Sequence, residues 1–308
     1  LGQINAHTGM YHDALRYYRS ALQVRRKIGD QSGIAYSTNN LGNHYRAVGE
    51  YEKALDAYRQ SLALYEEMGN EQGRGRVLSD MADLYCYLGC YEQSLRYAQE
   101  AYEIQEIVRD LDNKAQTLIV RGHVFEGLGQ IRQALSCYRQ ARALFERVKD
   151  VRGACHALNS IGSVQSKLSQ ADQALRSYAM ALSRLQAIEA RDVQVECLTG
   201  MGLVYLRRRQ KAKALACTQQ AVRLLECGIG HVAPQQTYFV HAQALRANGH
   251  FMKAKEYLQK SHEELMRRAR SIRDRELRES FLCRVEANRV IFHAASLTSS
   301  SKMIIINR

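Results

Sequence analysis

Residues 41–61, LGNHYRAVGEYEKALDAYRQS, contain the pattern that decides the fold. The same spacing of small and apolar residues returns every 40 residues along the 308-residue chain, without an insertion or deletion. The columns are Gly2, Gly42, Ala82, Gly122, Gly162, Gly202 and Ala242; Ala14, Ala54, Ser94, Ala134, Ala174, Ala214 and Ala254; Leu15, Leu55, Leu95, Leu135, Leu175 and Leu215, broken at Lys255; and Ala21, Ser61, Ala101, Ala141, Ala181, Ala221 and Ser261. Self-similarity at a fixed period of this length predicts an all-α solenoid.

The columns have a physical interpretation. Gly and Ala recur where two helices must approach closely, and large residues such as Tyr58, Tyr138 and Tyr178 are expected to fill the space beside them. Within one unit, Leu55, Tyr58 and Leu62 recur at helical intervals, which is typical of an amphipathic helix with a period of about 3.6 residues.

Two kinds of turn separate the helices. Between the two helices of a unit, glycine supplies the positive φ that follows a helix end, and its positions are Gly9, Gly49, Gly89, Gly129 and Gly249. Ser169 and Arg209 stand in this column in two units, so we expect those turns to be strained or differently shaped. Between units, short polar residues are expected to cap the next helix, at Asp30, Asn70, Asp110 and Asp150.

The pattern resembles the tetratricopeptide repeat. The residues that carry the resemblance are Leu41, Gly42, Tyr45, Gly49, Tyr51, Ala54, Tyr58 and Ser61, with their equivalents in the later units. The resemblance implies antiparallel helix pairs stacked into a right-handed superhelix. Units of 40 residues, longer than the common unit of about 34, resemble those of kinesin light chains, Pins-like adaptors and the sensor regions of bacterial STAND-type signalling ATPases.

The expected organisation is a single extended array. Residues 1–272 are predicted to form about seven units, the first of them truncated, because the chain begins inside a first helix. Apolar residues at 277, 281, 285 and 292 predict one capping helix over residues 273–297, and Phe281 is expected to pack against the last repeat. Residues 298–308 are expected to form a loose tail.

The composition of the chain indicates which kinds of partner and which cellular compartment to expect. The formal net charge of +13 favours acidic partners, although an Arg-rich solvated helix surface would give the same value. The eight cysteines have no paired zinc spacing, which favours free thiols in a reducing, cytoplasmic compartment. No apolar run is long enough to span a bilayer, so no membrane partner is expected.

Motifs for catalysis and cofactor binding are missing. The sequence contains no nucleotide-binding glycine loop, no H-E-x-x-H and no nucleophile elbow, so we expect neither an enzyme nor a cofactor. His123 and His156 could face one groove from adjacent first helices, where a metal or proton role competes with simple groove polarity, and we favour the latter.

The tetratricopeptide resemblance places ligand binding on the first helix of each pair, which lines the concave surface. The expected groove residues are Tyr36, Asn39, Asn40, Asn43, Arg46, Arg76, Ser79, Asp80, Asp83, His123, His156 and Asn159. Asn40 and Asn43 could hold a peptide backbone through paired donors and acceptors. The alternative interpretation of these residues is an ordinary hydrated helix face.

One basic cluster, residues 207–213, falls at a turn between two helices. It could bind nucleic acid or an acidic protein, but no aromatic residues are interleaved, so a solvated turn is favoured and nucleic acid is not expected. The sequence therefore favours a non-enzymatic scaffold that binds a protein or peptide. The alternative is a sensor arm that contacts other domains of a longer signalling ATPase or transcription regulator.

Overall fold

The computed structural model describes residues 11–188, 190–227 and 233–299, and within these ranges the secondary structure is entirely α-helical. Fifteen helices are found in this part of the chain, in agreement with the prediction of an all-helical array. They are α2 (Tyr11–Ile28), α3 (Gln31–Val48), α4 (Tyr51–Glu67), α5 (Glu71–Tyr87), α6 (Tyr91–Ile107), α7 (Leu111–Gly127), α8 (Ile131–Arg147), α9 (Val151–Lys167), α10 (Ala171–Leu185), α11 (Arg191–Arg207), α12 (Lys211–Glu226), α13 (Pro234–Ala247), α14 (Phe251–Arg270), α15 (Arg275–Cys283) and α16 (Glu286–Ser299).

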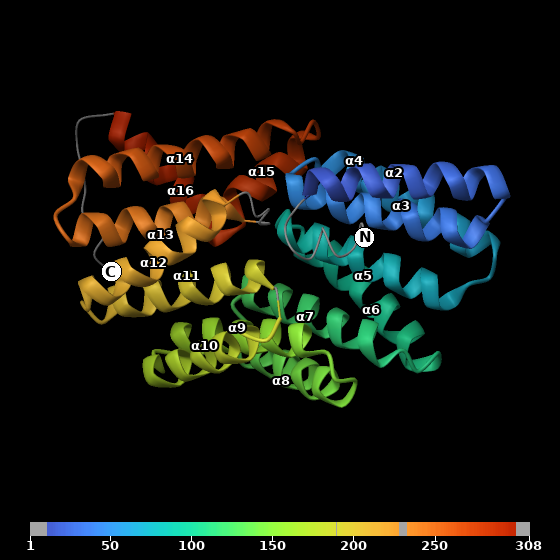
Figure 1. Cartoon of the computed structure of the whole chain (residues 1–308), viewed down its shortest axis with the longest axis horizontal. Helices are drawn as coiled ribbons and strands as arrows, with labels where there is room; N and C mark the ends of the chain where they lie inside the picture. Colours follow the sequence, from blue (N-terminus) through green and yellow to red (C-terminus); the bar gives the residue numbers. More distant parts are fainter. Residues whose placement is uncertain (1–10, 189, 228–232, 300–308) are drawn as a thin grey trace.

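Neighbouring helices pack as pairs, α3 with α4, α5 with α6, and so on to α13 with α14. The first helices of successive pairs, α3, α5, α7, α9, α11 and α13, also contact one another, which places them on the inner side of the curve. Figure 1 shows the pairs following one another around this curve, from blue through green to orange. The inner layer is therefore made by the first helices, as the tetratricopeptide resemblance implies.

The small-residue columns lie where the helices of a pair cross. A Cβ atom on Gly42 would lie 2.5 Å from Cε1 of Tyr58, and one on Gly122 would lie 2.3 Å from Cε1 of Tyr138. In the third repeat, where the small residue is Ala82, alanine also stands in the tyrosine column, and both alanines are fully buried. In these three repeats the two columns are thus complementary in size, because the larger alanine in one is matched by a smaller residue in the other.

The turns keep one shape throughout the array. Gly49 and Gly89 have φ of 89° and 79°, and Ser169 and Arg209 have φ of 60° and 59° in the same left-handed region. The two substituted turns are therefore strained but not reshaped, since this conformation costs a non-glycine residue about 1–2 kcal/mol. The predicted N-caps are confirmed: the side chain of Asp30 accepts a hydrogen bond from the Gly33 N–H, and Asn70, Asp110 and Asp150 do the same for their helices.

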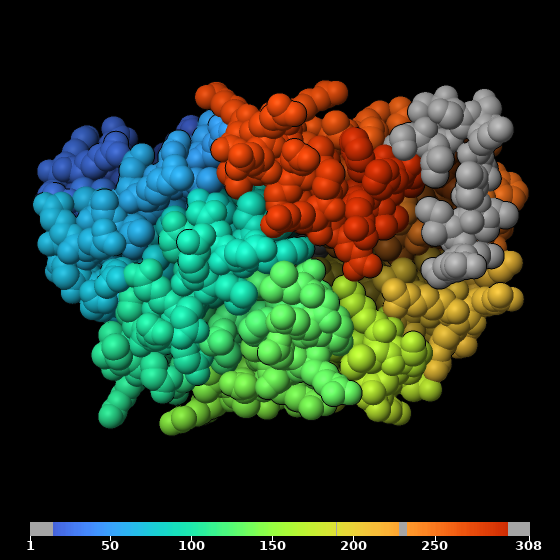
Figure 2. Space-filling model, turned by 180° about the vertical axis from the view of Figure 1, so that it is seen from behind, coloured from blue at the N-terminus to red at the C-terminus, as the bar shows by residue number. Residues whose placement is uncertain are grey.

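The array curls until its last repeat meets the second and third repeats. Arg268, at the end of α14 and only 2% exposed, donates hydrogen bonds to the Ala47 carbonyl (3.3 Å) and the Tyr51 hydroxyl (3.2 Å). The Ser271 hydroxyl donates to the carbonyl of Gly49. From behind, Figure 2 shows the orange and red C-terminal helices lying directly against the blue and cyan atoms of these repeats.

Phe281 has a larger role than the sequence predicts. It belongs to the same buried cluster as Leu265 and Ala269 of the last repeat, but its ring also lies 5.8 Å from that of Tyr51 and 5.6 Å from that of Tyr87. The expectation of a simple terminal cap is thus incomplete, because Phe281 joins both ends of the array.

The predicted single capping helix is two helices in the structure, α15 and α16, separated at residues 284–285. Across this break, the Asn288 amide donates to the Phe281 carbonyl at 3.0 Å and satisfies a backbone acceptor at the end of α15. The tail expected at residues 298–308 lies outside the described residues from residue 300 onward.

Candidate functional site

Polar side chains on the inner helices form a ladder that joins each repeat to the next. Many of its contacts link residues 37 or 38 positions apart, two or three residues short of the 40-residue period, because the side chain of one first helix meets the preceding turn of the next. The contacts of this polar ladder are Asn43–Asp80, Arg46–Asp83, Ser79–Thr117, His123–Ser160, Glu126–Ser163, Asn159–Glu196 and Thr199–Thr237.

Asp80 on α5 is the centre of the first group in the ladder. Its Oδ2 atom accepts hydrogen bonds from the amide nitrogens of Asn39 (2.7 Å) and Asn43 (3.0 Å). Burial raises the pKa of the Asp80 carboxyl, although the two amides and nearby Arg46 oppose this effect. The Asn43 carbonyl oxygen in turn accepts from the Tyr58 hydroxyl at 2.7 Å. Both polar groups of Asn43 are therefore engaged within the chain.

Two residues of the expected groove set are buried by this ladder. Asn39 is 1% exposed, and Ser79 is buried and accepts a hydrogen bond from Thr117 at 2.9 Å. Arg46 pairs with Asp83 at 2.7 Å. Asn40 is half-buried, and no hydrogen bond joins its side chain to the described residues. Among the asparagines of α3, Asn40 is consequently the one whose amide is open to a ligand.

Tyr36 and Arg76 lie at an open hollow between the second and third repeats. The guanidinium carbon of Arg76 lies 5.5 Å from the centre of the Tyr36 ring, and that of Arg25 lies 5.7 Å from it. The hollow has a volume of about 370 Å³ and a mostly polar lining, which includes Ser32, Asn70 and Gln72. It offers cationic, aromatic and amide groups side by side, together with the carboxylate of Asp30, which pairs with Arg25 at 3.8 Å.

A second group gathers His123, His156, Asn159 and Glu196 on α7, α9 and α11. The two histidine rings lie 5.8 Å apart, and Nε2 of His156 lies 3.8 Å from Oε2 of Glu196, which also accepts from Asn159 at 2.9 Å. Burial, then the neighbouring His123, lowers the pKa of His156 to about 4. Burial, then Asp192, raises the pKa of Glu196 to about 8.

The raised pKa of Glu196 predicts a stability that falls as pH rises from 6.5 to 8.5. Below pH 8 the folded chain keeps a proton that the unfolded glutamate releases near pH 4.5, so raising the pH favours unfolding. His156 acts in the opposite sense, but only between pH 4 and 6.5. Because the Glu196 side chain is 31% exposed, we expect a loss of about 1 kcal/mol.

Chemical denaturation at pH 6.5 and 8.5 measures this effect, and Glu196→Gln should remove the Glu196 part of the slope. Parallel curves of unfolding free energy against pH for the wild type and the variant would contradict the assignment. Glu146→Gln provides a control: burial raises the pKa of this carboxyl, but Arg142 and Arg184 together outweigh burial, so the pKa is lowered.

The basic turn at residues 207–213 is largely tied to the preceding repeat. Arg207 donates to the hydroxyl and carbonyl of Ser166, and Arg208 pairs with Asp172 at 2.7 Å. Lys213 lies over the ring of Tyr205. These contacts leave few free cations at the turn, in keeping with the interpretation as a solvated turn.

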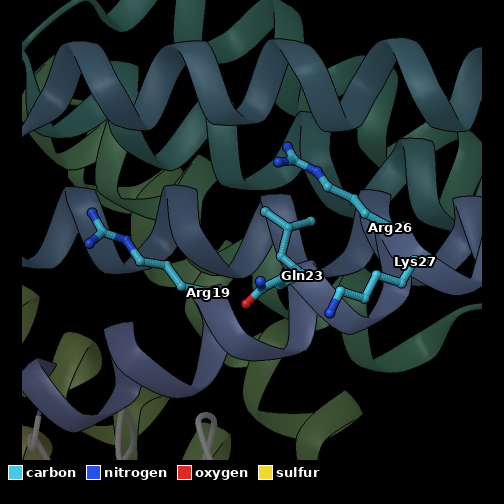
Figure 3. A pocket seen from close by; sticks show the side chains of 5 residues that line it. Arg19, Gln23, Arg26 and Lys27 are labelled. Carbon is cyan, nitrogen blue, oxygen red and sulfur yellow. The ribbon is translucent and has the colours of Figure 1, made fainter.

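A second hollow, of about 440 Å³, lies on α2 and is lined by Arg19, Leu22, Gln23, Arg26 and Lys27. Figure 3 shows that the labelled side chains all rise from this one helix, so among the described residues a single element lines this hollow. In the described ranges, no group of three or more His, Cys, Asp or Glu residues is arranged to hold a metal ion. Likewise, none of the helices described is both long and apolar enough to cross a lipid bilayer.

Sequence reasoning missed the surface at which the array closes. Two turns share the sequence Gly-x-Tyr-Glu, at residues 49–52 and 89–92, and no other unit has it. In both turns the tyrosine and glutamate contact the C-terminal segment: Glu52 binds the backbone N–H groups of Arg273 and Asp274, and Glu92 pairs with Arg284. The Gly-x-Tyr-Glu sequence that the two turns share is the signal from which this surface could have been found.

Comparison with known proteins agrees with this architecture. A model of the tetratricopeptide repeat family matches residues 1–67 and 74–147. No curated protein matches the chain significantly.

Solved structures are similar in fold. A Rap protein complexed with competence and sporulation factor is 13% identical, covers 93% of this chain and 87% of its own, and has a TM-score of 0.63. The STAND protein with a tetratricopeptide repeat sensor from Pyrococcus horikoshii is 13% identical over 96% of this chain and 48% of its own, with a TM-score of 0.60. BtubC from P. vanneervenii is 18% identical over 70% and 91%, with a TM-score of 0.54.

Proposed function

We propose, on the premise that the chain is a tetratricopeptide-type repeat protein, that it is a non-enzymatic scaffold whose inner helices bind a segment of another protein. The observation that carries this proposal is the open, polar hollow between the second and third repeats. Tyr36 and Asn40 share one face of α3, four residues apart, and Arg76 and Asp80 share the corresponding face of α5. Tyr36, Asn40 and Arg76 would contact the bound segment, and Asp80, which accepts from Asn39 and Asn43, would support them from within.

The chemistry of the hollow, together with Asn40 one turn along α3 from Tyr36, suits an extended peptide with an acidic side chain. Asn40 offers a donor and an acceptor to a peptide backbone. Arg76 stacks on Tyr36, and its planar guanidinium is suited to pair with a carboxylate. The polar ladder holds α3 and α5 in register, which lowers the ordering cost of binding. Asn39, Asn43, Ser79 and Asp83 would support the groove from within, and His123, His156 and Asn159 would line its continuation.

A capture experiment followed by calorimetry tests the proposal. The double variant Asn40→Ala/Arg76→Ala should weaken binding of a captured partner by about 1–3 kcal/mol, because the partner's polar groups lose their hydrogen bonds. The array should stay folded, since neither side chain is fully buried. The control variant Arg207→Ala/Arg208→Ala/Arg209→Ala should bind normally. Loss of capture in this control, with unchanged binding by the double variant, would move the site to the basic turn.

A second candidate is a sensor arm within a larger signalling protein. The observation in its favour is that the similar STAND protein contains an array matching 96% of this chain within about half of its own length. The test is the coding sequence that precedes the Leu1 codon. A nucleotide-binding loop encoded there would favour the sensor arm, and its absence would favour the independent scaffold.

A further inference from the structure

The C-terminal part of the chain holds α3 and α5 at one end of each helix. Arg268 donates to the carbonyl of Ala47, next to the last residue of α3, at 3.3 Å. Tyr87, the last residue of α5, has its ring 5.6 Å from that of Phe281, and its hydroxyl accepts a hydrogen bond from Gln235 at 3.3 Å. In Figure 1, α15 lies between α14 and the helices of the second repeat. Gln235, Arg268 and Phe281 together form a latch on the two inner helices.

The candidate binding groups lie toward the other end of the same two helices. Tyr36 and Arg76 line the polar hollow between the second and third repeats, and the guanidinium carbon of Arg76 lies 5.5 Å from the centre of the Tyr36 ring. Each precedes the residue that the latch holds by eleven positions, Tyr36 before Ala47 and Arg76 before Tyr87. The polar hollow and the latch are therefore separated by about 16 Å of helix.

Between the polar hollow and the latch, a few polar contacts join α3 to α5. Asp80 accepts from Asn39 and Asn43, and Arg46 pairs with Asp83 closer to the latch. The two helices approach each other less closely than α5 and α7, α9 and α11, or α11 and α13 do. These contacts fix the register of α3 against α5, whereas the angle between the helices also depends on what holds their ends.

We infer that the latch sets the angle between α3 and α5 and thereby the width of the polar hollow. With the latch closed, both helices are fixed at their C-terminal ends, so Tyr36 and Arg76 are held at one separation. When the latch is released, the helices splay about the hydrogen bonds to Asp80, and the polar hollow takes a range of widths. The consequence for binding rests on the proposed function: a segment bound in the polar hollow and a closed latch stabilise each other, because such coupling is reciprocal.

The apolar part of the latch is concentrated in Phe281. It is the buried residue of α15, and the ion pairs that accompany it, Glu52–Arg273 and Glu92–Arg284, are exposed and therefore weak. Removing the ring should free the end of α5, while α3 stays held through Arg268. The repeats themselves should persist, since each is stabilised by its neighbours in the array.

Distances between pairs of spin labels report this angle without any ligand. Ketone-bearing non-natural residues carry the labels, so the eight native cysteines stay unchanged. The test pair, at positions 32 and 112, spans the contact of α3 with α5 and that of α5 with α7. The control pair, at positions 71 and 151, spans the contacts of α5 with α7 and of α7 with α9. All of these positions carry exposed side chains.

Phe281→Ala should broaden the distance distribution of the test pair about twofold and leave that of the control pair unchanged. Phe251→Ala, which removes an exposed ring at the start of α14, should change neither distribution. An unchanged test pair, or equal broadening of both pairs, would overturn the inference. Circular dichroism first establishes that the Phe281→Ala chain is folded, and Phe281→Leu replaces it if it is not.

The outcome of the distance measurement is independent of the capture experiment. If the test pair broadens but Asn40→Ala/Arg76→Ala binds a captured partner normally, the latch stands and the proposed groove contacts fail. If that double variant loses binding but the test pair does not broaden, the groove contacts stand and the latch does not set the width of the polar hollow.

Discussion

Phe281→Ala should lower the free energy of unfolding of the C-terminal region by about 3–5 kcal/mol, the range found when a buried phenylalanine is truncated. The ring is fully buried and touches both Tyr51 and Tyr87, so its removal leaves a cavity that two neighbouring aromatic side chains cannot easily fill. Hydrogen exchange should therefore increase in α15 and also around Tyr51 and Tyr87, more than 190 residues away along the chain.

Phe251→Ala is the matched control. Phe251 begins α14, in the same part of the chain, but its side chain is 65% exposed, so its truncation should change stability by less than about 0.5 kcal/mol. If Phe281→Ala denatures like the wild type, and exchange near Tyr51 and Tyr87 stays the same, the two ends of the array are not held together by this side chain.

The repeat fold could be predicted because its determinants are local and periodic. The Gly42 and Tyr58 columns, the capping residues such as Asp30, and the glycine turns all act within one unit or between adjacent units, and each recurs every 40 residues. The sequence therefore encodes the same interaction in each repeat. Ser169 and Arg209 show the limit of this reasoning, because the surrounding helices impose the left-handed turn even where glycine is missing.

The closure of the array could not be predicted in this way. Arg268 meets Ala47 and Tyr51 across 217 to 221 residues of chain, and no periodic signal connects positions so far apart. The curvature that brings them together sums small rotations over successive repeats. The amphipathic pattern around Phe281 predicts burial, but it does not identify the surface that buries it.

The sequence predicts which helix face carries the candidate groove residues. It does not predict which of those side chains are engaged within the chain. The 40-residue period places Asn39, Asn40 and Asn43 on one inner helix, and α3 does carry them. Whether an amide contacts a ligand or the neighbouring repeat depends on the residue 37 positions later, here Asp80 for Asn43. An asparagine opposite a carboxylate is engaged within the array, whereas Asn40 is not, which is why the proposed contacts now rest on Asn40, Tyr36 and Arg76.

Gly122→Ala should destabilise the array by about 1–3 kcal/mol, the range expected for overpacking. The sign of this stability change is informative. Gly122 lies inside α7, and in an isolated helix alanine is more favourable than glycine by up to about 1 kcal/mol. The new Cβ would lie 2.3 Å from Cε1 of Tyr138, whose ring is fully buried and whose hydroxyl donates to Glu126 at 2.9 Å. The ring is thus fixed at both ends, so steric overlap should outweigh helix propensity.

A double-mutant cycle with Tyr138→Ala separates these two effects. Gly122→Ala/Tyr138→Ala recreates the alanine pair that the third repeat has at Ala82 and Ala98, so the two changes should be coupled and the double variant more stable than the sum predicts. Chemical denaturation of the four proteins measures the coupling. Gly42→Ala with Tyr138→Ala, whose sites lie in different repeats, should be additive. Additivity in the first cycle would show that the two columns do not match each other in size, and the packing rule drawn from the repeat would fail.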